Sequence, residues 1–224
     1  MEVEKLILQS NNFLEQFHFY VETLELELLE KNKNFFSVKA GKSRLVFQKS
    51  ATRCYYHFAF NVPPFQITEA LDWTQKRIEI LEYEGAPVID FPTWNAKAFY
   101  FFDADKNIVE LIDRRNLNIK TELPFSTKNL LEISEIGLPV NDIQQTFDSL
   151  NKQISIDKYS GDLKTFCAAG DEHGLFIIVN KNKKNWLPTE LPAKAFPFEL
   201  YFKMDDEQYL LNYSGEEISL KKRL

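Results

Sequence analysis

The stretch FYFFDADKNIVELID, residues 99–113, contains two apolar runs joined by a short polar turn. Aromatic and β-branched residues on either side of an Asp- and Asn-containing turn are typical of an antiparallel hairpin. If residues 103–106 form a four-residue loop, Glu110 on the second strand lies opposite Phe99 on the first. The stretch therefore predicts a β-hairpin with an acidic side chain in the middle of its second strand.

This hairpin ends a unit of one strand, one helix and three strands, and the unit recurs along the chain. The order βαβββ is predicted for about the first 50 residues, for residues 55–113 and, more loosely, for residues 131–181. In the second unit the helix is expected over residues 67–81. The tail from residue 198 holds three short β-type runs and is too short for a full unit. Such self-similarity is typical of duplicated supersecondary structure, so we predict an α+β fold of tandem βαβββ modules.

Composition limits the classes of function. The 224 residues are 44% hydrophobic and 27% charged, a mixture typical of globular proteins. The net charge is −6 and the basic residues are scattered, so nucleic acid is not an expected partner. Two cysteines and three histidines predict neither a disulfide scaffold nor a Cys/His zinc site. The charged N-terminus and the lack of a long apolar run predict a cytoplasmic protein with no membrane partner.

Two local phrases carry a family resemblance. Phe19-Tyr20 follows the first predicted helix, and FDADKNIVEL at residues 102–111 forms a turn and a final strand. Together with the repeated module order, they resemble the vicinal-oxygen-chelate superfamily, which contains glyoxalases, bleomycin-resistance proteins and extradiol dioxygenases. The resemblance implies that modules pair and that their mixed sheets curl into a cup. It also implies a small-molecule ligand.

The resemblance further implies a division of the chain. Residues 1–113 are expected to form one complete domain of two paired modules, and residues 114–130 a linker. Residues 131–224 are expected to hold the third module and a truncated fourth, which support the structure. A monomer and a homodimer both remain open.

Metal-dependent members of this superfamily take ligands from an early position on a module's first strand and from a Glu or His on its last strand. The equivalent positions here are Lys5, His57 and Glu135 on first strands, and Val46, Glu110 and Ile177 on last strands. The resemblance thus implies one divalent metal ion, Zn, Ni, Mn or Fe, held by His57 and Glu110. Two observations oppose it, because a catalytic metal usually has three protein ligands and because the Lys5 ammonium is expected in the same cup. No second metal centre is expected at Glu135.

Strand alternation defines the rest of the expected pocket. Phe58 and Phe60 suit the helix-packed face of their strand, which turns His57 and Asn61 into the cup. By the hairpin register above, an aromatic wall faces Glu110, and Trp94 lies at the rim. The residues predicted to bind a small molecule are Lys5, Val46, Asn61, Phe99 and Phe101.

Function is narrowed to two classes. The leading hypothesis is a small-molecule-binding protein of the glyoxalase type that works as a metal-assisted lyase, isomerase or dioxygenase-like enzyme. Without a metal, His57 and Glu110 would form an acid–base pair or a hydrogen-bonded polar pair. The alternative is a non-enzymatic protein that sequesters a drug or metabolite. No nucleotide-binding or hydrolase motif occurs, and no catalytic residue is assigned.

Overall fold

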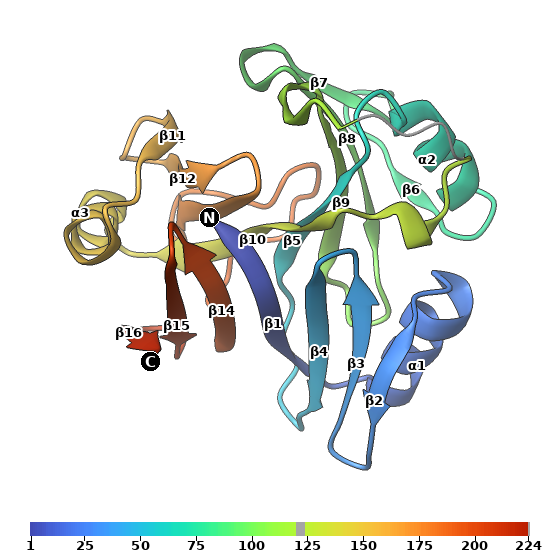
Figure 1. Cartoon of the computed structure of the whole chain (residues 1–224), viewed down its shortest axis with the longest axis horizontal. Helices are drawn as coiled ribbons and strands as arrows, with labels where there is room; N and C mark the ends of the chain where they lie inside the picture. Colours follow the sequence, from blue (N-terminus) through green and yellow to red (C-terminus); the bar gives the residue numbers. More distant parts are fainter. Residues whose placement is uncertain (120–123, 224) are drawn as a thin grey trace.

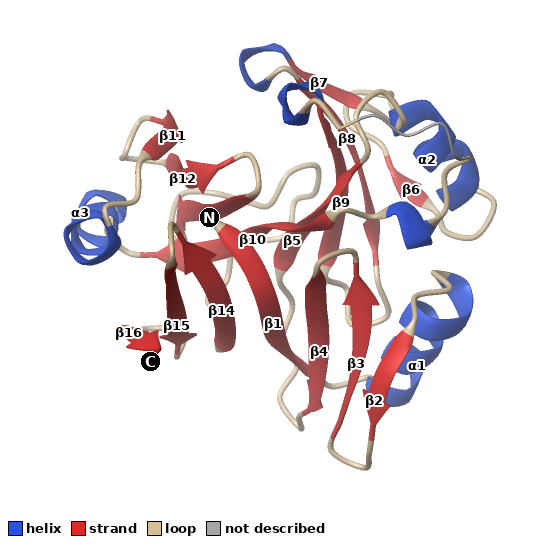
Figure 2. Ribbon diagram, in the orientation of Figure 1, coloured by secondary structure: helices blue, strands red, loops and turns tan. Residues whose placement is uncertain are grey.

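The computed structural model describes residues 1–119 and 124–223. Part of the predicted linker, residues 120–123, and Leu224 lie outside the described residues. The described chain forms two β-sheets with helices at their sides (Figures 1 and 2). Both sheets are mixed, because each contains parallel as well as antiparallel strand pairs. The predicted α+β class is therefore confirmed, and neither sheet closes into a barrel.

The first sheet contains the first module and the C-terminal strands. In spatial order its seven strands are β16 (Ile218–Arg223), β15 (Glu207–Tyr213), β14 (Phe198–Met204), β1 (Glu2–Ser10), β4 (Ser43–Lys49), β3 (Phe35–Ala40) and β2 (Leu28–Lys31). Between β1 and β2 the chain forms α1 (Phe13–His18) and a short π-helical turn, η1 (Phe19–Thr23). The first module and the truncated fourth thus form one sheet.

The second sheet contains the second and third modules. Its main path is β11 (Lys158–Gly161), β12 (Phe166–Asp171), β13 (Gly174–Asn180), β10 (Glu132–Val140), β5 (His57–Val62), β9 (Ile108–Arg114), β8 (Ala96–Phe102) and β6 (Ile80–Leu81), and β7 (Ile89–Phe91) pairs with β8. The helices of these modules are α2 (Ile67–Thr74) and α3 (Ile143–Ile154). Short 3-10 turns are η2 (Pro92–Trp94), η3 (Arg115–Leu117) and η4 (Thr127–Asn129).

The modules pair differently from the expectation that the first two share one cup. β5 of the second module pairs antiparallel with β10 of the third, and β1 of the first module pairs antiparallel with β14. Every residue of β5 and β10 is buried, so these two strands need neighbours on both edges and cover on both faces. The first and second modules consequently lie in different sheets. The division at residues 113 and 131 remains a prediction.

Most predicted elements occur where the sequence places them, and the helix of the second module is an exception. It was expected over 67–81, but α2 ends at Thr74. The Arg77 guanidinium donates to the Trp73 carbonyl at 3.0 Å and so satisfies one carbonyl of the last turn. Ile80 and Leu81 then form β6, which pairs with β8. These two apolar residues therefore belong to the sheet and not to the apolar face of the helix.

The main hydrophobic core follows strand alternation. In β5, Phe58, Phe60 and Val62 join this core, which leaves His57, Ala59 and Asn61 on the opposite face of the sheet. In β9, Val109 and Leu111 point into the core in the same way. The predicted alternation of both strands is therefore confirmed, and the opposite face of the nine-stranded sheet carries the polar residues that matter below.

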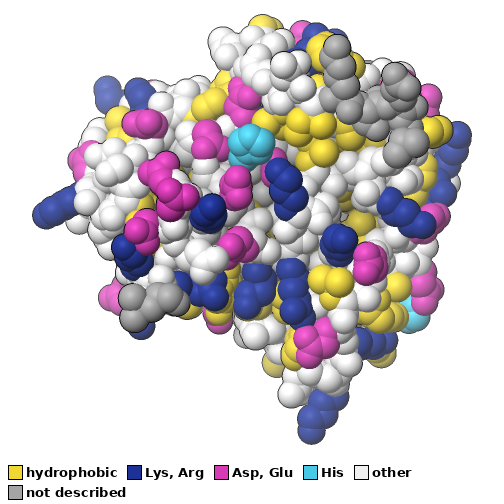
Figure 3. Space-filling model, in the orientation of Figure 1, with side chains coloured by type: hydrophobic (Ala, Val, Ile, Leu, Met, Phe, Trp, Pro, Cys, Tyr) yellow, Lys and Arg dark blue, Asp and Glu magenta, His cyan; other side chains and the backbone are white. Residues whose placement is uncertain are grey.

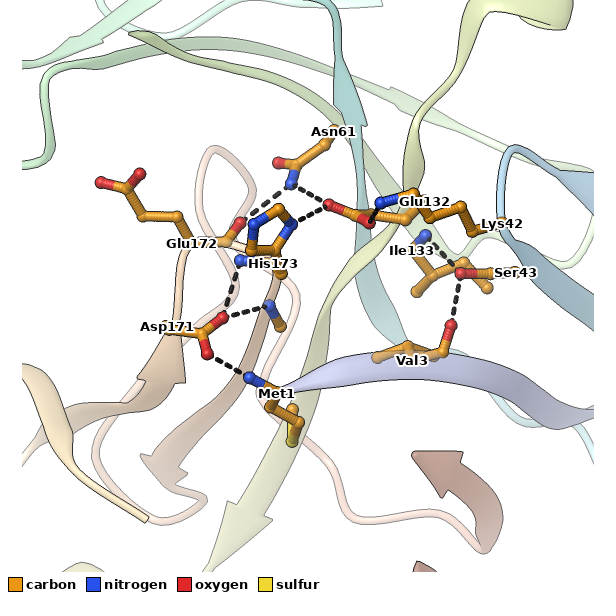
Figure 4. Close-up of polar contacts among 11 residues, drawn as sticks. Met1, Val3, Lys42, Ser43, Asn61, Glu132, Ile133, Asp171, Glu172 and His173 are labelled. Carbon is orange, nitrogen blue, oxygen red and sulfur yellow. Dashed lines mark hydrogen bonds and ion pairs between the residues drawn. The ribbon is translucent and has the colours of Figure 1, made fainter. Parts of the chain in front are cut away.

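The two sheets meet through close backbone and polar contacts. Gly41 has a φ of +60°, and a Cβ atom built on it would lie 2.0 Å from the Leu131 carbonyl oxygen, so the approach requires glycine. Next to it, the Ser43 hydroxyl donates to the Val3 carbonyl at 2.6 Å and accepts from the Ile133 amide at 2.9 Å (Figure 4). The turn between β3 and β4 is thereby fixed against the beginning of β10.

A buried carboxylate extends this junction. Glu132 accepts from Asn61 at 3.2 Å and from His173 at 2.8 Å, and its second oxygen lies 3.6 Å from the Lys42 ammonium (Figure 4). Because burying an ion needs compensation, these three partners explain how Glu132 is tolerated between the sheets. On the face shown in Figure 3, basic and acidic side chains are intermixed. Among the described residues, no helix has the length and apolarity to cross a membrane.

Candidate metal centre

His57 begins β5 and is held in one orientation. Its Nδ1 lies 3.2 Å from the Ile108 carbonyl oxygen, which can only accept a hydrogen bond. Nδ1 therefore carries the proton, and the lone pair of Nε2 is free to bind an electrophile. The Trp186 indole lies against the imidazole with ring centroids 5.1 Å apart. Gly137 permits this contact, because a Cβ atom there would lie 2.6 Å from the indole.

Two carboxylates converge on that Nε2 atom from the neighbouring strands. Oε2 of Glu110, on β9, lies 3.5 Å from it, and Oε2 of Glu135, on β10, lies 3.6 Å from it. β5 lies between β9 and β10 in the sheet, so three adjacent strands each supply one donor. All three side chains are buried. The imidazole and the carboxylate that the sequence singled out therefore do meet, together with a third donor.

Burial and charge determine the protonation of this cluster. Burial and the neighbouring Glu135 carboxylate raise the pKa of Glu110 well above its usual range, while Arg114 and a hydrogen bond from Tyr100 oppose the rise. Arg114 is fully buried and donates from Nη2 to Oε1 of Glu135. Oε2 of Glu135 therefore remains directed at His57. Without a cation, burial and the Glu135 carboxylate therefore favour the protonated form of Glu110.

The donor set fits a divalent metal ion. The three ligand atoms lie within 4.8 Å of one another, and ligands about 2.1 Å from a tetrahedral ion would be about 3.4 Å apart. The distances of 3.5 and 3.6 Å from Nε2 of His57 to the two carboxylate oxygens are close to that value. A 2+ charge also compensates two buried carboxylates better than Arg114 does alone. One imidazole and two carboxylates suit Zn, Mn, Ni and Fe, and three protein ligands leave a position open for a substrate.

A cavity of about 270 Å³ gives access to the cluster. His57, Glu110 and Glu135 lie in its wall together with five aromatic side chains, Phe91, Trp94, Tyr100, Phe166 and Trp186. An apolar concavity with a few convergent polar groups is the usual form of a small-molecule site. Trp94 lies in the wall of this cavity, close to the rim position expected for it.

Three of the predicted binding residues lie elsewhere. Lys5 is on β1 in the other sheet, where its ammonium lies 3.6 Å from the centroid of the Tyr201 ring. Val46 is paired with Ile7 in the same seven-stranded sheet. Asn61 is on the correct face of β5 but hydrogen-bonds to Glu132 and to the Glu172 carbonyl. Since Lys5 is remote from the cluster, the expected repulsion between its ammonium and a metal ion does not arise.

The predicted aromatic wall is off by one residue. The loop between β8 and β9 has five residues, 103–107, so Tyr100 rather than Phe99 lies opposite Glu110. A shift of one residue moves every side chain of a strand to the other face. Phe99 and Phe101 accordingly pack in the main core.

Glu135 is the member of this cluster that the sequence does not predict. The sequence places it on the first strand of the third module, equivalent to His57, but its own module offers no second ligand to support a metal site. The missing signal was the pairing of β5 with β10, which places Glu135 beside the ligands of the second module.

The sequence matches no family profile and no curated protein. Solved structures are nevertheless similar in fold. A putative dioxygenase from Bacillus subtilis subsp. subtilis str. 168 superimposes with a TM-score of 0.65 at 12% identity, covering 99% of this chain and 84% of its own. A V278E mutant of glyoxalase I from Zea mays gives a TM-score of 0.50 at 14% identity, covering 79% of this chain and 66% of its own.

A lactoylglutathione lyase from Agrobacterium tumefaciens aligns over 52% of this chain and 96% of its own, with 16% identity and a TM-score of 0.45. The chain has the fold of a glyoxalase I and of a putative dioxygenase, as the resemblance to the vicinal-oxygen-chelate superfamily implied. Identities this low establish the fold alone.

Proposed function

We propose that this protein is a divalent-metal-dependent enzyme that moves a proton on a small molecule, as a lyase or an isomerase does. The observation that supports this most is the convergence of His57, Glu110 and Glu135 at the wall of an aromatic cavity. Oxygen-activating Fe(II) sites of the facial-triad type use two histidines and one carboxylate. The reverse ratio here favours proton transfer over dioxygenase chemistry.

The residues divide the work as follows. His57 and Glu135 bind the ion, His57 through the Nε2 that its Nδ1 hydrogen bond leaves free. Arg114 orients Glu135 by occupying one of its oxygens. Glu110 holds the third position, and its carboxylate is suited to accept a proton from a substrate carbon and return it to the neighbouring one. A bound divalent ion would act as a Lewis acid toward a substrate oxygen.

Metal content is the first test. Protein purified without chelator, or reloaded with Zn²⁺, Mn²⁺ or Ni²⁺, is expected to hold one ion per chain by elemental analysis. His57→Ala and Glu135→Gln are expected to lose it. His18→Ala is the matched control, because His18 is an exposed histidine paired with Glu22 at 2.8 Å, and it should retain the ion. Equal metal content in all four proteins would refute the assignment.

Activity is tested next with the reactions named for the similar structures. The loaded protein is assayed for the glyoxalase I reaction and, separately, for dioxygen uptake with catechol. The proposal expects proton-transfer activity that disappears in Glu110→Gln. Catechol-dependent oxygen uptake with no isomerisation would overturn the proton-transfer assignment, and ligand binding by a metal-free, inactive protein would favour sequestration.

A further inference from the structure

The cavity beside the metal ligands has a definite size and shape. Its volume of about 270 Å³ compares with about 150 Å³ for a cavity that accepts one benzene molecule. It therefore has room for a single ring with one or two short substituents. The buried Tyr100 and Trp186 rings lie next to His57, with centroids 6.3 and 5.1 Å from the imidazole.

Three further rings form the outer, partly exposed part of the cavity wall. Phe91 and Trp94 are 6.0 Å apart with an interplanar angle of 29°, and Trp94 and Phe166 are 6.3 Å apart at 27°. Trp94 is thus inclined by less than 30° to each of the other two rings. An aromatic wall favours a ligand with its own π-system, since aromatic pairs gain energy beyond the area that they bury.

The charges around the cavity favour an anion. Lys184 lies in its wall, with its ammonium 4.9 Å from the centroid of the Phe166 ring. Within residues 1–119 and 124–223, no carboxylate lies at ion-pair distance from this ammonium. The positive charges of Arg114, Lys184 and a bound divalent ion together exceed the negative charges of Glu110 and Glu135.

We infer that the substrate of the proposed enzyme is a planar conjugated acid, a ring or an enone system that carries a carboxylate. Its plane packs on the aromatic wall, its carboxylate pairs with Lys184, and further oxygens face the metal ligands. This inference rests on the proposed function only for its reacting end. The binding of the ring and the carboxylate depends on residues outside the metal cluster.

Binding of four probes tests the inference in the presence of EDTA, by titration calorimetry and by quenching of tryptophan fluorescence. The probes are salicylate, salicyl alcohol, cyclohexanecarboxylate and benzyltrimethylammonium. Salicylate is expected to bind at least tenfold more tightly than each of the other three. Equal binding of cyclohexanecarboxylate would refute planarity, and equal or tighter binding of salicyl alcohol or benzyltrimethylammonium would refute the acidic class.

Lys184→Met is expected to weaken salicylate binding about tenfold and to leave salicyl alcohol unchanged. Lys183→Met is the matched control, since it removes the same charge from an exposed neighbour, and it should bind salicylate as the wild type does. Equal effects of the two variants would refute the role of Lys184. Circular dichroism confirms that both variants are folded.

The failure of this inference and the failure of the proposed function are separable. If no metal binds but salicylate selectivity in EDTA persists and depends on Lys184, the substrate class stands and the metal enzyme does not. If metal binds through His57 and Glu135 while the four probes bind alike, the metal centre stands and the substrate class is refuted.

Discussion

Replacing Glu110 by Gln distinguishes the effect of the carboxylate cluster on stability from its effect on metal binding. The substitution keeps the shape of the side chain and removes one of two carboxylates whose ligand atoms lie within 4.8 Å of each other. At that distance two ionised carboxylates repel by about 3 kcal/mol if the effective dielectric constant is about 20. In the wild type, burial raises the pKa of Glu110 and so favours the protonated carboxyl, which lessens this repulsion. With metal removed, Glu110→Gln is therefore expected to be as stable as the wild type, or up to about 3 kcal/mol more stable.

Adding metal should stabilise the wild type more than the variant. Metal at a thousand times its dissociation constant stabilises a folded protein by about 4 kcal/mol. Loss of a ligand should weaken binding at least about 100-fold, the upper end of what loss of a supporting group costs. The variant then gains no more than about 1.4 kcal/mol at the same concentration.

Urea denaturation at neutral pH, with EDTA and then with Zn²⁺, measures both effects. Glu22→Gln is the control, because Glu22 is an exposed glutamate paired with His18, and it should resemble the wild type within about 0.5 kcal/mol in both conditions. Destabilisation of Glu110→Gln in EDTA, or a gain from Zn²⁺ equal to that of the wild type, would refute the reasoning.

Three further predictions concern the fold and the support of the site. Burial raises the pKa of Asp103 from 3.8 to about 6, and a raised folded-state pKa gives stability that is complete below pH 3.8 and lost as the pH rises through 6. The stability of the wild type relative to Asp103→Asn should therefore fall by up to about 3 kcal/mol between pH 4 and 7, and a rise would contradict this. Gly41→Ala should cost at least about 2 kcal/mol more than Gly85→Ala in urea denaturation, because both positions have positive φ but only Gly41 meets backbone of the other sheet; equal costs would contradict the contact. Gly137→Ala should displace Trp186 and weaken metal binding by calorimetry about tenfold, and unchanged affinity would show that the indole does not support the site.

The local structure could be predicted because it depends on neighbouring residues. Alternation within β5 and β9 correctly placed His57 and Glu110 on the face opposite the main core. The register of the hairpin could not be fixed in the same way. Both a four-residue and a five-residue loop fit the sequence around Asp103, and the choice rests on a cage of hydrogen bonds to that carboxylate. Gln16 donates at 2.6 Å, Tyr20 at 2.9 Å and Asn107 at 2.7 Å.

Two of these donors come from the first module, far away in the sequence. Gln16 lies in α1 and Tyr20 in η1, so the loop conformation depends on tertiary structure that no local pattern reveals. The same is true of Glu135. Its position on its strand was correct, but its neighbours depend on which modules share a sheet.

The predictions that Lys5 and Val46 bind the ligand were wrong for the same reason, the pairing of the modules. Both residues occupy the positions equivalent to ligands in their own module, as the sequence indicated. Their sheet contains β14, β15 and β16 in place of a complete partner module. Among the described residues, only His57, Glu110 and Glu135 form a cluster able to hold a metal ion, and it lies in the other sheet.

The most direct test of the metal centre is anomalous diffraction from crystals grown with Zn²⁺ and measured at the zinc edge. We predict one strong peak per chain, about 2.0–2.2 Å from Nε2 of His57 and from one oxygen each of Glu110 and Glu135. Crystals with full zinc occupancy elsewhere, for example at His173 and Glu132, and with no peak among these three residues would contradict the account.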